Sequence, residues 1–475
     1  MSRTILACSM LAIATACIGT PNASAATTAV TYTKDIAPLL QAKCIECHRT
    51  EGLAPFNLQS YEQVRAWSKA IRKEVHEGRM PPWGLDPEVG EWSNDPTFSK
   101  EEMATLDAWL EGGQPKGNPK DMPEPLEFFE DWSIGKPDMI FEMPNEVIIP
   151  AEGVMPYQYH VTEMNIEEDL YVQSLEVLPG NRRVVHHIIV FLQPPPAVAN
   201  AMSDGLTNAM LDVYAPGSPA GINPPGVARL IPAGSKLQWQ IHYTPTGEEE
   251  RDRSRFAIVL AKEKPKELMR TATVINMNFE IPPNTDNYRV ESKMIIPKDA
   301  TIYSYTPHMH YRGKAMDFFL KYPDGTEELA CSIPKYDFNW QLDYFLQEPK
   351  KVPAGTEVRV VALFDNSTGN PYNPDPTKAV RWGEQTYEEM MMGGVFLSWA
   401  DGVVDVPEVE SVELTEADLA STKAMIAAQD TNGDGALQKE EVPKGMQQFF
   451  GMVDANADGE LDATELYTVL KGRGQ

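Results

Sequence analysis

The sequence predicts a multidomain α+β protein: a small α-helical domain, two antiparallel β-sandwich domains and a C-terminal helical pair. Three observations predict it. Apolar residues recur at helical spacing before residue 116, short β-branched runs separated by Pro, Gly and Asn fill residues 130–408, and two Asp- and Gly-rich loops follow residue 413. A chain of 475 residues with 42% hydrophobic content can bury a core in each domain.

The first 25 residues are typical of a secretory signal peptide. Arg3 supplies a positive start, residues 5–18 are apolar, and Ala23-Ser24-Ala25 is a small-residue cleavage site. The apolar stretch is too short to span a bilayer, and no later stretch is long enough. We therefore expect export across the inner membrane, to the periplasm or beyond. A net charge of −28 argues against nucleic acid or an anionic membrane as partner, because polyanions would be repelled.

Residues 26–116 form the predicted helical domain. Two runs have helical apolar spacing, and they consist of Val64, Trp67, Ile71 and Val75 and of Met103, Leu106, Trp109 and Leu110. Gly112-Gly113 is expected to end the second helix. Residues 117–129 are rich in Pro, Gly and Asp and are expected to be a linker.

The motif Cys44-Ile45-Glu46-Cys47-His48 matches the attachment site of a c-type haem. In such a site two thiols form thioethers to the haem and the adjacent imidazole ligates the iron. A bare dithiol redox motif is the alternative, but the histidine that follows at once favours one covalent haem. For the sixth ligand we expect Met80, in the loop Gly78–Trp83, and His76 is the competitor.

Residues 130–265 and 266–408 are expected to form the two sandwiches, because so many short strands exceed one sandwich. The divide is expected near Lys262–Lys266. Cys331 is the one cysteine outside the signal peptide and the haem motif, so disulfides do not hold this fold together. We expect Cys331 to be a small buried hydrophobe.

Five of the eight histidines lie in strand-like sequence, as His186-His187, His242 and His308-Met309-His310. His308 and His310 are two apart and can chelate one ion from one face of a strand. Adjacent His186 and His187 would face opposite sides of a regular strand, so sharing an ion requires irregular backbone or binding through different ring nitrogens. Two metal sites are predicted, one of three imidazoles and one of two imidazoles and a thioether. A thioether favours copper that cycles through Cu(I).

The position of His242 follows from the alternation in Leu237–Tyr243. The apolar side chains of this run are expected to face the core, which turns Gln238, Gln240 and His242 toward a polar cavity.

Residues 413–475 carry two twelve-residue loops of the EF-hand pattern. Oxygen ligands are expected from Asp430, Asn432, Asp434, Ala436 and Glu441 and from Asp454, Asn456, Asp458, Glu460 and Glu465. Gly435 and Gly459 allow the sharp turn that each loop needs. We expect two Ca²⁺ ions with a structural role, while Mg²⁺ or empty loops remain alternatives.

In this order, the segments Val185–Ile188, Gln240–Tyr243, His308–His310 and Glu388–Met390 resemble the type II copper, ascorbate-dependent monooxygenases, the family of peptidylglycine α-hydroxylating monooxygenase and dopamine β-monooxygenase. The resemblance covers about residues 130–408 and implies jelly-roll-like sandwiches. In that family the two coppers face each other across a solvent cleft.

The resemblance also implies a role for each ligand. His186, His187 and His242 would hold the electron-transfer copper, and His308, His310 and Met390 the catalytic copper that binds O2. Met391 is the alternative thioether, but the Glu-Glu-Met pattern favours Met390. The implied activity is hydroxylation of a C–H bond of a small organic substrate, with electrons that pass from an external donor through the haem to the coppers.

Three departures from the family pattern bear on the substrate. The animal enzymes contain disulfides, which this chain cannot form, and Thr306-Pro307 stand where the peptide-amidating enzyme has a carboxylate-binding arginine. Gly394 stands where that enzyme has a tyrosine. Peptide amidation is therefore not expected, and the fused haem takes the place of ascorbate.

Two other functions remain as alternatives. The first is a non-catalytic electron-transfer or copper-binding protein that uses the same fold without an organic substrate. The second is a calcium-dependent surface-binding protein, which would leave the histidine ligands without a role.

Overall fold

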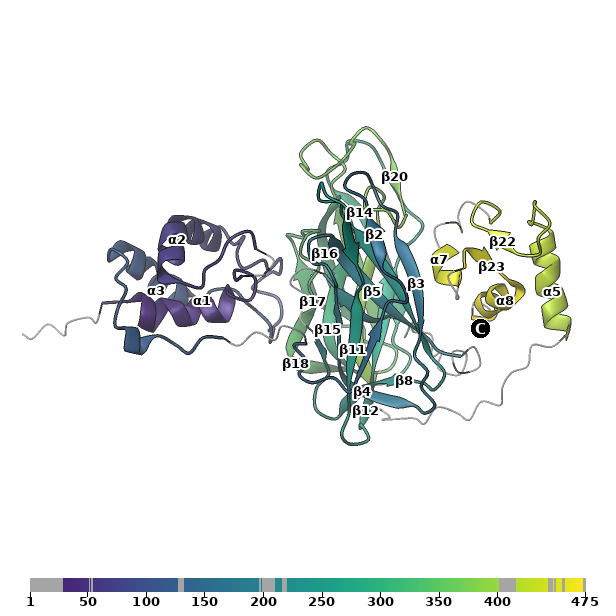
Figure 1. Cartoon of the computed structure of the whole chain (residues 1–475), viewed down its shortest axis with the longest axis horizontal. Coiled ribbons are helices and arrows are strands. Elements are labelled where there is room, and N and C mark those ends of the chain that lie inside the picture. The colour runs from purple at the N-terminus through teal and green to yellow at the C-terminus, as the bar shows by residue number, and fades with distance from the viewer. Residues whose placement is uncertain are drawn as a thin grey trace, which may run out of the picture.

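The computed structural model describes residues 29–50, 52, 54–126, 132–195, 198, 210–215, 220–400, 416–442, 447, 450–454 and 458–472. An N-terminal helical unit, a central β body and a C-terminal helical unit follow one another in Figure 1. The chain is thus a β-rich protein with helical parts at both ends. The expected signal peptide lies outside the described residues. Within those residues, no helix combines the length and the apolar character needed to cross a membrane.

The helices of the N-terminal unit are η1 (Tyr32–Ile36), α1 (Ala37–Lys43), α2 (Tyr61–His76), α3 (Lys100–Glu111) and η2 (Pro119–Asp121). Capping boxes begin α2 and α3, because the Ser60 and Ser99 hydroxyls each accept a hydrogen bond from the third helical N–H. Gly112 follows the last residue of α3, as predicted. The apolar faces of the helices enclose a small core around the fully buried Trp109.

The segment after α3 packs on the helical unit before the chain leaves it. The Tyr32 N–H donates to the Pro115 carbonyl (2.9 Å), and the Gln41 Nε2 donates to the Glu124 carbonyl (3.0 Å). The linker expected over residues 117–129 stays a prediction. Within it, η2 forms a short helical turn, and the Glu124 carbonyl is the acceptor of the hydrogen bond from Gln41 of α1.

A docking segment, residues 83–95, joins the helical unit to the β body. The Asn94 side chain donates to the Asp343 carbonyl (2.8 Å) and accepts the Phe345 N–H (3.0 Å). The Trp83 ring lies edge-on to Tyr344 at 4.8 Å, and Trp92 lies edge-on to the same ring at 6.0 Å. These contacts attach the helical unit to one edge of the β body.

The first β unit contains β1 (Met139–Glu142), β2 (Val147–Ile149), β3 (Gln158–Glu163), β4 (Leu170–Leu178), β5 (Val185–Gln193), β6 (Met210–Tyr214), β7 (Gly221–Ile222), β8 (Val227–Ile231), β9 (Lys236–Tyr243), β10 (Glu250–Asp252) and β11 (Arg255–Leu260). The sheet β3-β9-β5-β6 faces the run β1-β11-β4-β8. Apolar side chains from both sheets form one core, including Ile188 and Trp239 on one side and Val172 and Phe256 on the other.

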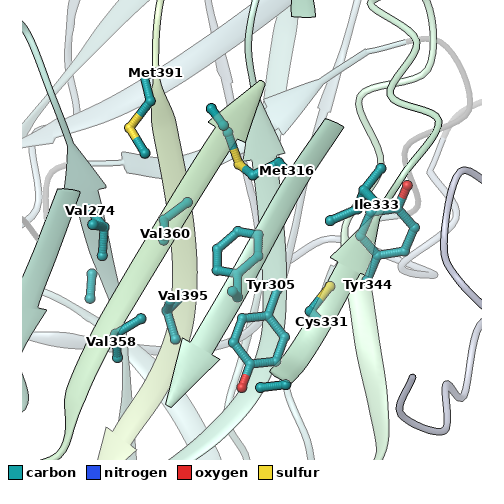
Figure 2. Close-up of a cluster of buried hydrophobic side chains, with 14 of the residues drawn as sticks. Val274, Tyr305, Met316, Cys331, Ile333, Tyr344, Val358, Val360, Met391 and Val395 are labelled. Atoms are coloured by element: carbon teal, nitrogen blue, oxygen red, sulfur yellow. The ribbon is translucent and has the colours of Figure 1, made fainter. Parts of the chain in front are cut away.

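The second β unit contains β12 (Glu267–Ile275), β13 (Glu280–Ile281), β14 (Tyr288–Ile295), β15 (Ala300–His308), β16 (Gly313–Lys321), β17 (Glu327–Ile333), β18 (Tyr344–Val352), β19 (Glu357–Phe364), β20 (Val380–Arg381) and β21 (Met392–Trp399). The sheet β14-β19-β16-β17 faces β12-β21-β15-β18. Figure 2 shows part of the core between them, with Cys331, Tyr305 and Met391 among its side chains. Cys331 is a buried free thiol, as predicted.

The two β units share one sheet. Strand β8 pairs in parallel with β12, with Val227 opposite Glu267, so the long sheet runs β1-β11-β4-β8-β12-β21-β15-β18. The divide expected near Lys262–Lys266 lies between β11 and β12 and separates the two cores. It does not separate the sheet, which continues across it.

The C-terminal unit contains α5 (Glu416–Ala427), β22 (Leu437–Gln438), α7 (Phe450–Val453), β23 (Glu460–Leu461) and α8 (Ala463–Gly472). Strands β22 and β23 pair antiparallel and join the two EF-type loops. The Gln238 Nε2 of β9 donates to the Asp454 carbonyl (3.4 Å), and both residues are buried. The C-terminal unit is therefore packed against the first β unit.

Candidate metal centres

His186, His187 and His242 form a cluster of the kind that holds a metal ion. One ring nitrogen from each lies within 4.8 Å of the other two. The ring centroids form a nearly equilateral triangle with sides of 5.5 Å (His186–His187), 5.2 Å (His186–His242) and 5.2 Å (His187–His242). The structure thus brings together all three residues of the predicted three-imidazole site.

A β-bulge makes the cluster possible. In the antiparallel pair β5·β9, Val185 lies opposite Tyr243 and His187 opposite His242, so His186 has no partner and the register shifts there. A bulge leaves one extra residue on one strand and bends it, which lets two neighbouring side chains turn to the same side. The irregular backbone predicted at the adjacent histidines is confirmed.

Burial keeps these imidazoles neutral at pH 7. It lowers the pKa of His242 to about 4, with a further contribution from His186, and lowers the pKa of His187 well below its usual value. A neutral imidazole offers a lone pair to a metal, whereas a protonated one does not. The His242 Nδ1 is buried without a hydrogen-bond partner, and the Nδ1 atoms of His186 and His187 approach to 3.2 Å. One unpaired buried nitrogen beside two further ring nitrogens that converge fits a metal ligand set.

The polar face of β9 is covered rather than open. As predicted, the apolar side chains of this strand are buried in the core. Gln240, expected to face a polar cavity with Gln238 and His242, instead donates to the Tyr159 hydroxyl (2.7 Å), which donates to Glu384 Oε1 (3.0 Å). Gln238 lies under the C-terminal unit. The expectation of a cavity was wrong because tertiary packing covers this face.

His308 and His310 form the second cluster, at the end of β15. Their rings are 5.3 Å apart and nearly perpendicular. The His308 Nδ1 lies 2.6 Å from the Gln341 Oε1, and the His310 Nδ1 lies 3.3 Å from the Glu388 carbonyl. Because these oxygens accept the Nδ1–H groups, both Nε2 atoms carry free lone pairs. The His310 Nε2 is buried and has no hydrogen-bond partner, as expected of a metal ligand.

The segment before β21 brings Met390 toward the second cluster. The buried Glu389 carboxylate accepts the backbone N–H groups of His310 (2.8 Å) and Arg312 (2.6 Å), and its pKa is raised to about 8 by burial. Met391, the alternative thioether, lies fully buried in the core of Figure 2 and not at the histidines. Met390 as the ligand remains a prediction, and the exclusion of Met391 favours it.

Phe338 contacts one ring of each histidine cluster. Its ring stacks on His186 with centroids 5.2 Å apart and meets His310 edge-on at 6.0 Å. His186 and His310 therefore lie within about 11 Å of each other. The solvent cleft that the resemblance implies between the sites stays a prediction, and the buried Phe338 ring contacts both clusters.

Some residues at the clusters were not foreseen from the sequence. Tyr157 lies against the rings of His187 (5.4 Å) and His242 (5.1 Å). Phe338 and Gln341 come from the irregular connection between β17 and β18, which no periodic pattern marks. Glu389 had a signal, since it belongs to the Glu-Glu-Met segment, but its buried contacts depend on the fold.

The Cys44–His48 motif adopts a tight turn after α1. The His48 N–H donates to the Cys44 carbonyl (2.9 Å), and the His48 Nδ1 lies 3.2 Å from the Phe56 carbonyl, which leaves Nε2 free for an iron. Cys44 and Cys47 are free thiols, and burial raises the pKa of Cys44 to about 12. The donor set fits covalent haem attachment.

His76 is engaged elsewhere. Its Nε2 lies 3.0 Å from Asp107 on α3, on the exposed side of the helical unit. An imidazole paired with a carboxylate in this way is not directed at an iron, so the contact favours Met80 as sixth ligand. Met80 itself remains a prediction.

Both EF-type loops have the expected turns. Gly435 and Gly459 adopt φ angles of 92° and 89°, which residues with a Cβ rarely adopt. Asp430 accepts the Gly435 N–H (2.9 Å), and Asp454 accepts the Gly459 N–H (2.9 Å). Within the described residues, these loops keep the geometry predicted for Ca²⁺ binding, while Asn456 lies outside them.

The glutamate at the twelfth position of each loop is hydrogen-bonded to its own loop. Glu441 and Glu465, the expected bidentate ligands, accept backbone N–H groups of their own loops, from Thr431 (2.8 Å) and Asp462 (2.9 Å). Of the remaining predicted ligands, Asp434 and Asp458 accept N–H groups within their loops. Ala436 directly precedes β22, and Glu460 of β23 pairs with Gln438.

The comparisons with known proteins support one of these centres. A family model described as EF hand matches residues 446–470. These residues contain the second loop, from Asp454 to Glu465. The match supports calcium binding at the C-terminus. No curated protein matches the chain.

The similar solved structures resemble the chain only distantly. PNGF-II is 12% identical, with a TM-score of 0.27 over 55% of this chain and 66% of that protein, just under two thirds of its length. The major capsid protein P2 from bacteriophage PM2 is 8% identical, with a TM-score of 0.22 over 56% of this chain and 99% of that one. Likenesses of this strength carry no argument about function.

Proposed function

We propose that this chain is an exported copper-dependent monooxygenase of the type II copper, ascorbate-dependent family. In this proposal residues 26–116 are a cytochrome c domain, the two β units are jelly-roll-like copper domains and the C-terminal unit is an EF-hand pair. The reaction is hydroxylation of a C–H bond of a small organic substrate by O2, with electrons supplied through the haem.

The observation that carries the proposal is the pair of histidine clusters. The first offers three neutral imidazoles in a triangle, and the second offers two free Nε2 atoms beside a segment that contains a methionine. Both include a buried nitrogen without a hydrogen-bond partner. Buried side-chain nitrogens are usually hydrogen-bonded, so an unpaired nitrogen that lies beside further imidazoles favours a ligand role.

Bound copper would supply stored electrons and the activation of O2 at the two sites. The chain's own residues hold and orient the ligands. Gln341 and the Glu388 carbonyl set the tautomers of His308 and His310, and Glu389 holds the His310 backbone. Tyr157 packs against two rings of the three-histidine cluster, His187 and His242. This division of labour is typical of metal sites, where partners of the ligands fix ring orientation.

One electrostatic interaction of the helical unit favours electron entry at the three-histidine cluster. Burial raises the pKa of Tyr214 on β6, Arg182 lowers it and the Cys47 thiol raises it. Tyr214 lies opposite Ile188 in the pair β5·β6, next to His187. A haem attached at Cys47 would therefore lie close to the strand that carries His186 and His187.

A non-catalytic electron-transfer or copper-binding protein is the second candidate. It would use the same clusters but consume no organic substrate. Oxygen uptake separates the two, because only a monooxygenase consumes O2 in proportion to a hydroxylated product when a substrate is added. No uptake across a broad substrate screen would favour the carrier.

The first test is metal content in the mature protein. We expect two coppers for each haem, and His308→Ala or Met390→Ala should each lower the count to one, because removing a ligand from a three-ligand set costs most of its affinity. His242→Ala should remove the other copper. Copper and iron are measured by elemental analysis and the cupric signals by electron paramagnetic resonance.

His160→Ala is the matched control. His160 lies on β3, next to β9, and also has a buried Nε2 without a partner, but it belongs to neither cluster. It should keep both coppers. A chain that binds one copper or none, unaffected by His308→Ala and Met390→Ala, would overturn the monooxygenase proposal.

A further inference from the structure

Phe338 contacts both histidine clusters at once. It lies in the connection between β17 and β18, with its side chain 7% exposed. The phenyl ring is nearly parallel to His186, with an interplanar angle of 15° at 5.2 Å, and perpendicular to His310 at 6.0 Å. The Phe338 side chain thus connects the two clusters through two direct ring contacts.

Hydrogen bonds tie the position of Phe338 to the second cluster. The Gln341 Nε2 donates to the Phe338 carbonyl (3.1 Å), while the Gln341 Oε1 lies 2.6 Å from the His308 Nδ1. On the other side, the Tyr336 hydroxyl donates to the Met309 carbonyl (2.7 Å) and accepts the Met309 N–H (3.0 Å). These hydrogen bonds therefore fix the position of the Phe338 backbone relative to the histidines of the second cluster.

The other neighbours of Phe338 form a cavity. Tyr311 meets Phe338 edge-on at 4.9 Å, and a cavity of about 340 Å³ is lined by Phe338, Tyr311, Tyr336 and Tyr372. Phe338 is therefore a wall between this cavity and His186. Replacing the ring by a smaller side chain would open a path for water to the space between the clusters.

We propose that Phe338 is the contact through which an electron crosses from the three-histidine site to the His308/His310 site. This inference rests on the proposed function. The ion held by His186, His187 and His242 loses one electron and is oxidised, the ion held by His308 and His310 gains it and is reduced, and no bond is formed or broken.

Atoms in contact give Phe338 this role. Electron tunnelling weakens exponentially with distance and weakens faster across empty or water-filled space than through atoms in contact. The Phe338 phenyl ring joins one imidazole of each cluster through polarisable atoms in contact, and it has no polar atom that could bind either metal. Phe338 is thus a positioning residue for electron transfer and not a ligand.

The test uses the copper-loaded full-length chain in its oxidised form. One electron equivalent is delivered by pulse radiolysis, and the two cupric signals, assigned with His242→Ala and His308→Ala, are followed by freeze-quench electron paramagnetic resonance. Phe338→Leu is expected to slow transfer to the second site about tenfold, which corresponds to roughly 1.4 kcal/mol of activation free energy. Phe338→Tyr keeps the ring and should transfer at the rate of the unmodified chain.

The controls separate this role from a structural one. Phe279→Leu removes a stacked ring from the same β unit, 5.6 Å from Phe364, and should leave the transfer rate unchanged. Copper content and thermal unfolding are measured for every variant, and Phe338→Ile provides the same comparison should Phe338→Leu not fold. Transfer in the copper-replete leucine variant at the unmodified rate would overturn the inference. Absence of a second copper in the unmodified chain would instead overturn the proposed function.

Discussion

At the scale of single residues, the buried carboxyl group of Glu384 makes the stability of the fold depend on pH. Glu384 is 8% exposed, and burial raises its pKa to about 7, although the Tyr159 hydroxyl donates to it and Lys439 lies nearby. A carboxyl group that prefers its neutral form in the folded chain opposes folding once the unfolded chain can ionise it. The net contribution of Glu384 to the stability of the folded chain is therefore most favourable in acid.

The pH dependence of stability should reveal this group. Between the ordinary pKa of a glutamate and about 7, Glu384 binds more protons in the folded state than in the unfolded state. Its contribution to the free energy of unfolding therefore falls as the pH rises through this range. Above the folded-state pKa the contribution is constant. Glu384→Gln should remove this dependence and exceed the unmodified chain in stability at pH 8 by up to about 3 kcal/mol, with little difference at pH 4.5. Urea unfolding at the two pH values measures it.

The matched control is Glu163→Gln, at the exposed end of the same strand β3. The change that Glu163→Gln causes in the free energy of unfolding should be the same at pH 4.5 and pH 8. The change that Glu384→Gln causes should be larger at pH 8. An identical pH response of the Glu384→Gln variant and the unmodified chain would contradict the prediction.

At the scale of secondary-structure elements, irregular segments place the functional groups. The bulge in β5 turns His186 and His187 to one side, and the connection between β17 and β18 supplies Phe338 and Gln341. The docking segment, residues 83–95, adds a partner to the edge strand β18. An edge strand exposes unpaired backbone groups, and the docking segment satisfies several of them.

The docking segment should be sensitive to one side chain. Asn94→Ala removes the donor to the Asp343 carbonyl and the acceptor of the Phe345 N–H, so we expect a loss of about 1–2 kcal/mol of local stability from two hydrogen bonds. Hydrogen exchange of the Phe345 amide should become faster, and proteolytic cleavage within the docking segment should increase.

Asn339→Ala serves as the control for this change. Its side chain is exposed and bonds only within its own turn, to Asp337. The prediction fails if the Phe345 amide exchanges equally fast in the Asn94 variant and in the unmodified chain.

At the scale of the whole molecule, two helical units contact one β body. The helical unit is attached along β18, and the C-terminal unit is attached to β9, the strand that carries His242. The carbonyl that accepts from Gln238 belongs to Asp454, the first position of the second EF-type loop. Metal loading of that loop and the packing of the C-terminal unit on the β body are therefore physically linked.

Calcium removal should destabilise the C-terminal unit first. An ion that binds only the folded state stabilises it by about 2.7 kcal/mol at a hundredfold excess over its dissociation constant. A chelator, or Glu465→Gln in the presence of calcium, should lower the unfolding temperature of this unit in calorimetry without removing the other metals.

Glu440→Gln is the control, because Glu440 precedes the expected ligand Glu441 and is not at a ligand position of either loop. It should unfold as the unmodified chain does. Equal unfolding temperatures with and without calcium would show that the loops do not use the ion for stability.

What the sequence by itself determined is local. The spacing of apolar residues predicted helical ends and a β-rich middle, glycine at defined loop positions predicted the EF-type turns, and the number and order of histidines predicted two clusters. Even the bulge could be inferred, because two adjacent side chains on a regular strand cannot share an ion. These features depend on residues close together in the chain, whose geometry the backbone restricts.

Tertiary structure decided what lies between distant segments. Phe338 contacts both His186 and His310, the docking segment lies on β18, and the face of β9 expected to be open is covered by the C-terminal unit. No periodic pattern in the sequence predicts these contacts, because each contact joins an irregular segment to residues far away in the chain. Which surfaces meet is decided by packing of the whole chain, and only the folded structure reveals it.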